Sequence, residues 1–417
     1  MTGAAVGRQV VSAAVRSAAD SADTGGAMVE ESFGQALRRL RGTLSVRDLA
    51  RLASCGKTVV SDLETGKRSP TPAMARALDN ALAGQGQLVA LAEHPPGVRL
   101  SDRAASLHAA FADQLAAGPM TTASLEEWQF TIARHGRATR YRPEQELLTD
   151  LLADFSDLRS LLNHRHPPAI RRHLLCACSY LSGLVALTLL KLDDPGARDW
   201  WRTGRAAATQ AEDRPTLAWI YAQESYQLYY SGDWDGAVEL AARAQQLAGG
   251  LPCVADALAA PLEARVHALA GRRDDVVDAL RRAERAVARL APEDRQPSAL
   301  GYDEAQLAFH SGNAWTSLHE TQQAWDQQQR ALELYPQENR TDRTLILLDR
   351  AACLSWDGDA AAGAQLATDT VMALPDEYRS PLILYRARDL AVSVIETAAL
   401  LPEVRTLREV LALPSAG

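Results

Sequence analysis

A pair of helical stretches joined by a short turn recurs along this chain and constrains its fold more than any other feature. In the clearest copy, residues 217–249, an apolar helical stretch is followed by the turn Ser231–Asp233 and by a second stretch with alanines at positions 237 and 244. Seven residues complete about two helical turns, so Ala237 and Ala244 lie on one face. Small residues on that face allow a neighbouring helix to approach closely.

The two small positions recur before and after this copy at spacings of 39–48 residues. The equivalent pairs are Ala197 and Gly204, Val276 and Ala283, Ala324 and Ala331, and Gly363 and Thr370. Alternating runs of β-branched residues, which are typical of strands, hardly occur after about residue 124. The pattern predicts an all-α fold in which successive helix pairs stack into a solenoid, with a generic helical bundle as the alternative.

The phased series resembles the tetratricopeptide repeat over roughly residues 174–412. The standard repeat has about 34 residues, and the longer period here is similar to that of regulator-type tetratricopeptide domains in bacteria. The resemblance implies a concave face built from the first helix of each pair. We therefore expect a tetratricopeptide-like domain at residues 173–417.

Several aromatic and polar residues fall on the concave positions that the resemblance implies. They are Trp219, Tyr226, Tyr229, Tyr230, Arg265, Asn313 and Trp356. One interpretation is a groove for a peptide or a small apolar effector, in which Arg265 and Asn313 orient the ligand. The other is that the rings only pack between repeats.

The net charge of −8 is the sum of opposed parts. Residues 33–94 contain 9 Lys or Arg and 5 Asp or Glu, a net of +4, whereas residues 95–417 have a net of −10 and residues 1–32 a net of −2. A small basic module joined to a large acidic one indicates that nucleic-acid binding is confined to the basic part.

The basic module has the pattern of short helices with short breaks. Phe33 and Leu37 recur on one helical face, Leu49 and Leu52 are expected to face inward, and a break precedes a third helix at 57–64. Residues 45–78 resemble the phage-repressor-like helix-turn-helix class, the xenobiotic-response-element family of bacterial regulators. The resemblance covers about 60 residues and implies a domain at residues 31–93 that binds double-stranded DNA as a homodimer.

The resemblance also implies roles for individual residues. Lys57, Thr58 and Asp62 fall on positions that face base edges, and Ser45, Lys67 and Arg68 on positions that contact phosphates. Arg39 and Glu64 are expected to form a buried ion pair, or alternatively to be two solvated charges.

Two positions depart from the family pattern and weaken the attraction to the DNA backbone. Val46 stands where the family often has glutamine, and Asp62 stands near a position that usually carries a cation. We therefore expect moderate DNA affinity that depends on dimerisation. The alternative function is a protein-interaction scaffold with a vestigial helix-turn-helix.

The remaining segments complete the expected organisation. We expect a disordered tail at residues 1–30, a linker at 94–123 and connecting helices at 124–172, which offer a dimer face or pack within the molecule. The uncharged stretch 174–190 is interpreted as a buried helix and not as a membrane span. Translation starts at Met1 or Met28.

Catalytic and cofactor motifs are missing from the sequence. No HExxH, phosphate-binding glycine loop or Gly-x-Ser-x-Gly elbow occurs, so we expect neither an enzyme nor a cofactor. The cluster His164, His166, His173, Cys176 and Cys178 spans a proline break, and we expect no metal there. With only 5 cysteines, a cytoplasmic location is expected. Arginine supplies 41 of the 44 basic residues, which indicates a GC-rich, actinobacterial type of source.

Overall fold

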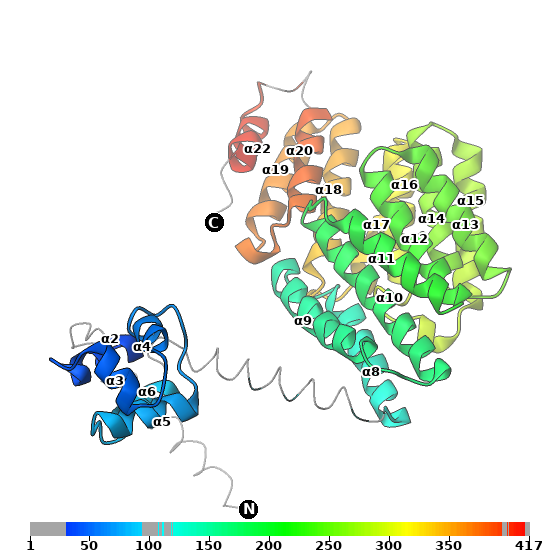
Figure 1. Ribbon diagram of the computed structural model, residues 1–417. Coiled ribbons are helices and arrows are strands. Elements are labelled where there is room, and N and C mark those ends of the chain that lie inside the picture. Colours follow the sequence, from blue (N-terminus) through cyan, green and yellow to red (C-terminus); the bar gives the residue numbers. More distant parts are fainter. Residues whose placement is uncertain are drawn as a thin grey trace, which may run out of the picture. The chain divides into compact units, whose positions relative to one another are not determined.

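The computed structural model describes residues 31–93, 120–393 and 400–412, together with residues 107, 111, 118 and 398. The chain divides into two compact units, Met1–Phe111 and Ala112–Gly417. Every regular element in the described residues is a helix (Figure 1), so the predicted all-α class is confirmed. The expected tail and most of the expected linker lie outside the described residues.

The first unit is a cluster of short helices. They are α2 (Phe33–Arg41), α3 (Val46–Leu52), α4 (Lys57–Glu64), α5 (Pro72–Ala81) and α6 (Gln87–Glu93). Leu37, Leu49, Val60 and Leu78 are completely buried in its core. The prediction that Leu52 faces inward is wrong, because this residue is 61% exposed. It is the last residue of a seven-residue helix, and only one side of that helix meets the core.

Side-chain caps explain where these helices begin. The Ser32 hydroxyl accepts from the Gln35 amide at 3.3 Å, and the Gln35 side chain accepts from the Ser32 amide at 2.8 Å, which is a complete capping box. Ser45 caps α3 and Thr71 caps α5, and each side chain accepts one hydrogen bond from a backbone amide of the first turn. Each cap satisfies backbone groups that the first helical turn leaves unpaired.

The second unit contains all the longer helices. They are α8 (Thr122–Ala138), α9 (Glu144–Leu162), α10 (Pro168–Lys191), α11 (Ala197–Gln210), α12 (Arg214–Tyr230), α13 (Trp234–Ala248), α14 (Val254–Leu269), α15 (Arg273–Arg289), η1 (Pro292–Asp294), α16 (Glu304–Ser317), α17 (Thr321–Leu334), α18 (Arg340–Trp356), α19 (Ala360–Met372), η2 (Asp376–Tyr378), α20 (Pro381–Ser393) and α22 (Pro402–Ala412).

Consecutive helices of this unit pack as pairs, from α10 with α11 to α18 with α19. The first helices of successive pairs, α12, α14, α16 and α18, also contact one another in order (Figure 1), as in a solenoid. The array then returns on itself, because α20 contacts α10 and η2 contacts α9. The first helices therefore surround an interior space.

The small positions of the repeat are where the paired helices meet. Buried residues occupy all of them: Ala197, Gly204, Ala237, Ala244, Val276, Ala283, Ala324, Ala331, Gly363 and Thr370. In four of the pairs, the residue five positions before the first small position has a left-handed backbone conformation and follows the end of the preceding helix. These residues are Gly232, Gly271 and Gly358, with φ of 81°, 68° and 98°, and His319, with φ of 58°.

Residues 124–172, expected to be connecting helices, belong to the body of the second unit. Leu147, Leu151 and Leu158 of α9 are buried in the same cluster as Leu174 of α10. The apolar side of α9 therefore packs mostly within the unit. The expected domain boundary at residue 173 is wrong, because it falls inside α10. That helix begins with proline at its first position, where a missing N–H costs nothing.

Among the described residues, α10 is the one helix long and apolar enough to span a membrane by length and composition. Of its most apolar window, 72% is buried inside the second unit. The interpretation of residues 174–190 as a buried helix is therefore confirmed.

Candidate nucleic-acid interface and interior cavity

Helices α3 and α4 form a tight helix–turn–helix. The turn uses Ser54 in a left-handed conformation, φ 52°, and the Cys55 amide donates to the Ala50 carbonyl at 2.8 Å. Ala50 and Ala53 are buried at the joint, where a larger side chain would separate the helices. The turn thereby holds α4 with its first residues in solvent.

The residues expected to read bases lie together on α4. Lys57 and Thr58 are exposed in its first turn, and Asp62, one turn after Thr58, is half-buried. In helix-turn-helix proteins, the N-terminal residues of the second helix contact base edges in the major groove. The arrangement can therefore present a lysine donor and a hydroxyl to bases, with a carboxylate beside them.

The residues expected to contact phosphates are all exposed, but Ser45 already has a partner. Lys67 and Arg68 lie in the loop after α4. The Ser45 hydroxyl donates to the Asp48 carboxylate at 2.6 Å and accepts from the Asp48 amide at 3.1 Å. A carboxylate in the first turn of α3 stabilises that helix and repels a phosphate at the same end. The expected phosphate contact of Ser45 does not take account of this carboxylate.

The expected ion pair between Arg39 and Glu64 is wrong. Arg39 instead bonds Glu31 at 2.7 and 2.8 Å and Gln87 at 3.1 Å. Glu64 is paired with Arg41, with Nε–Oε1 at 2.5 Å and Nη2–Oε2 at 3.2 Å.

The helical phase of α2 explains the exchange of partners. Gly34 lies against the end of α4, where an added Cβ would be 2.7 Å from the Leu63 carbonyl oxygen. At about 100° per residue, Arg41 lies within about 20° of Gly34 around the helix, whereas Arg39 lies about 140° away. Arg41 therefore faces Glu64, and Arg39 faces solvent.

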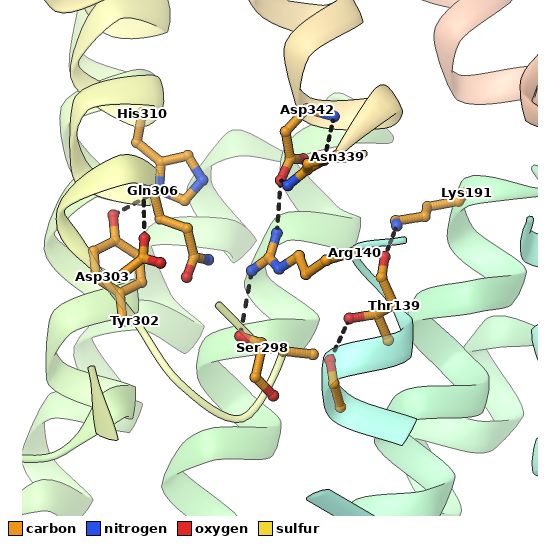
Figure 2. Close-up of polar contacts among 12 residues, drawn as sticks. Thr139, Arg140, Lys191, Ser298, Tyr302, Asp303, Gln306, His310, Asn339 and Asp342 are labelled. Carbon is orange, nitrogen blue, oxygen red and sulfur yellow. Dashed lines mark hydrogen bonds and ion pairs between the residues drawn. The ribbon is translucent and has the colours of Figure 1, made fainter. Parts of the chain in front are cut away.

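The second unit contains a partly open cavity of about 120 Å³. Side chains from the end of α8 and from α9, α10, α12, α14, α16, α18 and α20 line it. Its lining includes apolar and polar side chains, and Figure 2 shows polar contacts of several of the latter. His310, Gln306 and Arg140 are the polar residues on which its chemistry depends.

His310 is held as a neutral ring. Burial lowers its pKa well below 6.5, and the charges of Arg265 and Arg140 lower it further. Tyr302 and Tyr226 place their hydroxyls 2.8 and 3.3 Å from Nδ1. The Tyr226 hydroxyl donates to the Leu258 carbonyl at 3.1 Å, and the tautomer of His310 protonated on Nε2 gives the Tyr302 hydroxyl its acceptor.

Arg140 joins the beginning and the end of the array. Its Nη1 lies 3.1 Å from Oδ2 of Asp342, and its Nη2 lies 3.4 Å from the Ser298 carbonyl (Figure 2). Its buried Nε has no hydrogen-bond partner among the described residues. Lys191 similarly bonds the Thr139 carbonyl at 2.9 Å.

Gln306 is the most unusual polar group at the cavity. It lies one turn before His310 on α16 and is 3% exposed. Its buried Oε1 has no partner among the described residues. Leaving a buried polar group unpaired costs about 1–3 kcal/mol. A hydrogen bond between this amide and a molecule in the cavity would therefore be favourable.

Four of the residues expected in a ligand groove form one cluster. Arg265, 1% exposed, has its Cζ 4.3 Å from the centroid of the Tyr229 ring, 5.4 Å from Tyr230 and 5.8 Å from Tyr226. Its Nη2 donates to the Tyr230 hydroxyl at 3.3 Å. Tyr226 and Tyr230 also line the cavity.

The other three expected groove residues lie elsewhere. Trp219 donates to the Ala299 carbonyl at 3.0 Å, Asn313 donates to Asp349 at 2.8 Å, and Trp356 stacks on His319. None of the three lines the cavity. Of the seven residues expected in a groove, only Tyr226 and Tyr230 therefore line this cavity.

The neutral state of His310 predicts a pH effect on stability. The unfolded histidine binds a proton near pH 6.5 and the folded one does not, so the unfolded state gains protons and stability falls as the pH drops below 6.5. For His310→Gln we expect no such loss. Urea unfolding of the second unit at pH 7.5 and 5.5 should show about 1 kcal/mol more acid destabilisation in the unmodified protein than in the variant. Equal losses would contradict a neutral His310.

The cysteine–histidine cluster does not form a metal-binding group. The described residues contain no set of three or more His, Cys, Asp or Glu side chains placed to hold an ion. His166 and His173 bond backbone carbonyls of Leu161 and Ala169. Burial raises the pKa of the Cys178 thiol to about 12, so the thiolate that a metal requires is disfavoured.

Comparison with known proteins concerns the first unit alone. No curated protein and no solved structure matches the chain. Residues 32–92, which span α2 to α5 and nearly all of α6, match the family model described as a helix-turn-helix domain. The first unit therefore carries a helix-turn-helix domain, which suggests a DNA-binding regulator.

Proposed function

We propose that the protein is a cytoplasmic transcriptional regulator that binds double-stranded DNA as a homodimer and whose tetratricopeptide-like array senses an effector. The observation that carries the proposal is the exposed start of α4, with Lys57 and Thr58 free in solvent, inside a matched helix-turn-helix domain. The buried small positions of the helix pairs support the tetratricopeptide-like interpretation.

The small amount of positive charge on the DNA-facing side of the domain supports binding as a dimer. Asp62 lies beside the base-reading residues, and Asp48 occupies the start of α3, where a helix N-terminus would otherwise bind phosphate. One domain then has few phosphate contacts, whereas a dimer doubles them across two half-sites about 34–36 Å apart. The same carboxylates favour the rival function, a scaffold with a vestigial helix-turn-helix.

Binding of the full chain to DNA selected from a random pool tests the proposal. We expect Lys57→Ala with Thr58→Ala to lower affinity for the selected site about tenfold and to leave binding to unrelated DNA nearly unchanged, because base contacts specify. Lys67→Ala with Arg68→Ala should weaken binding to both DNAs and reduce the salt slope by about one for each lost contact. Fluorescence anisotropy at several salt concentrations measures both effects.

Arg281→Ala is the matched control, since it removes an exposed cation of α15 in the second unit. It should leave affinity and salt slope unchanged. Binding that is neither sequence-selective nor salt-dependent would support the scaffold instead.

A further inference from the structure

We propose that the interior cavity of the second unit binds a short-chain carboxylic acid, as its anion, with about five to seven non-hydrogen atoms. That this molecule is the effector rests on the proposed function. The binding site itself rests only on the geometry of the second unit.

The volume of the cavity favours a small ligand. Arg140, which follows α8, pairs with Asp342 of α18, and Tyr378 donates to the Tyr141 carbonyl at 2.9 Å, so distant parts of the chain meet around the cavity. Leu382 of α20 also lines it. The volume of about 120 Å³ is slightly below the ~150 Å³ that accommodates benzene in a protein interior.

The lining contains both apolar and polar side chains. Leu187, Leu258, Phe309 and Leu345 are among the apolar residues, and they suit a short hydrocarbon chain. The polar residues of the lining include His310, and also Gln306 and Arg140, whose buried Oε1 and Nε have no hydrogen-bond partner among the described residues. Rotation of the Gln306 amide exchanges its Oε1 with its N–H group, so Gln306 and Arg140 can both donate to a carboxylate.

The charges around the cavity favour an anion. Arg140 is balanced by Asp342 at 3.1 Å, and Lys191 by Glu144 at 3.5 Å. Arg142, which also lines the cavity, is balanced by Asp150. Arg265 lies 5.8 and 5.4 Å from the ring centroids of Tyr226 and Tyr230 and forms no ion pair with a described carboxylate. An uncompensated buried charge is unfavourable, and one negative charge in the cavity would offset it.

Binding of straight-chain carboxylates to the full chain, without DNA, tests the proposal. We would measure the melting temperature and calorimetric affinity with sodium butanoate, pentanoate, hexanoate and octanoate, at matched ionic strength and pH 7.5. We expect the tightest binding at butanoate or pentanoate and no further gain in affinity for octanoate, because its chain extends beyond the cavity of about 120 Å³. Pentanamide, which has the same shape without the charge, should bind at least tenfold more weakly than pentanoate.

Gln306→Leu connects binding to the cavity. Since the Gln306 side chain has no partner, this variant should fold with an unchanged or higher melting temperature but bind pentanoate at least tenfold more weakly. Gln246→Leu, at an exposed position of α13, is the matched control and should bind like the unmodified protein.

The outcomes separate this proposal from the regulator function. If no carboxylate binds, if Gln306→Leu binds normally, or if pentanamide equals pentanoate, the ligand assignment is overturned and the cavity holds only water or a neutral molecule. DNA binding would be unaffected by that result. If pentanoate binds but selective DNA binding is absent, the site stands and the regulator function fails.

Discussion

Replacing Gly34 with alanine is expected to unfold the first unit and to leave the second unit folded. An added Cβ would lie 2.7 Å from the Leu63 carbonyl oxygen and 2.8 Å from that of Glu64. Both atoms are backbone at the end of α4, so no side-chain rotation relieves the overlap and α2 must move away. Overpacking costs about 1–3 kcal/mol, and we expect about 3 kcal/mol here because the obstacle is rigid. That is a large share of the stability of a domain this small.

Hydrogen exchange followed by mass spectrometry on the full chain measures this effect by segment. Peptides from residues 33–93 should lose protection, whereas peptides from α10 should keep it, because the two units have separate core clusters. Gly56→Ala is the control: its Cβ would be 3.7 Å from the nearest side-chain atom, so only a helix-cap change of about 1 kcal/mol or less is expected. Unchanged protection in 33–93 would mean that α2 and α4 are not in contact at Gly34.

Features that local sequence patterns encode were predicted correctly. The spacing of Ala237 and Ala244 depends only on helical geometry, and both are buried where two helices meet. The break expected before the helix at 57–64 is the turn at Ser54 that precedes α4. In each case the residues that decide the structure lie within one or two helical turns of each other.

The cavity could not be predicted from local patterns. It depends on contacts such as that of Arg140 with Asp342, which are 202 residues apart, and on the contact of α20 with α10, which no local pattern indicates. A weaker signal was present and missed: Gln306 and His310 are polar residues one turn apart on the first helix of a pair.

The prediction that Arg39 is the partner of Glu64 follows the family resemblance, whereas the orientation of α2 about its own axis places Arg41 there. The contact of Gly34 with α4 sets which side of α2 faces that helix, and Arg41 lies seven residues, about two turns, after Gly34. The spacing was therefore visible in the sequence, but the importance of Gly34 was not.

Glu64→Gln is expected to destabilise the first unit by about 2 kcal/mol. The Glu64 side chain is 6% exposed and that of Arg41 is 17% exposed, and Arg38 lies 3.7 Å from the same carboxylate. Breaking a buried pair costs about 3–5 kcal/mol, and we expect less here because Arg41 keeps its bond to the Leu44 carbonyl and some contact with water. Urea unfolding of the first unit in the full chain measures the loss.

A double-mutant cycle identifies the partner that matters. If Glu64 acts through Arg41, then Glu64→Gln combined with Arg41→Met should cost at least 1 kcal/mol less than the sum of the single changes, since neighbours that share an interaction are not additive. Arg39→Met is the matched control. Arg39 and Glu31 are 53% and 38% exposed, and water and salt screen such pairs, so Arg39→Met should have little effect and be additive with Glu64→Gln. Coupling of Glu64 to Arg39 instead would restore the pairing that the family resemblance implied and would mean that α2 is rotated by more than a third of a turn from the position described here.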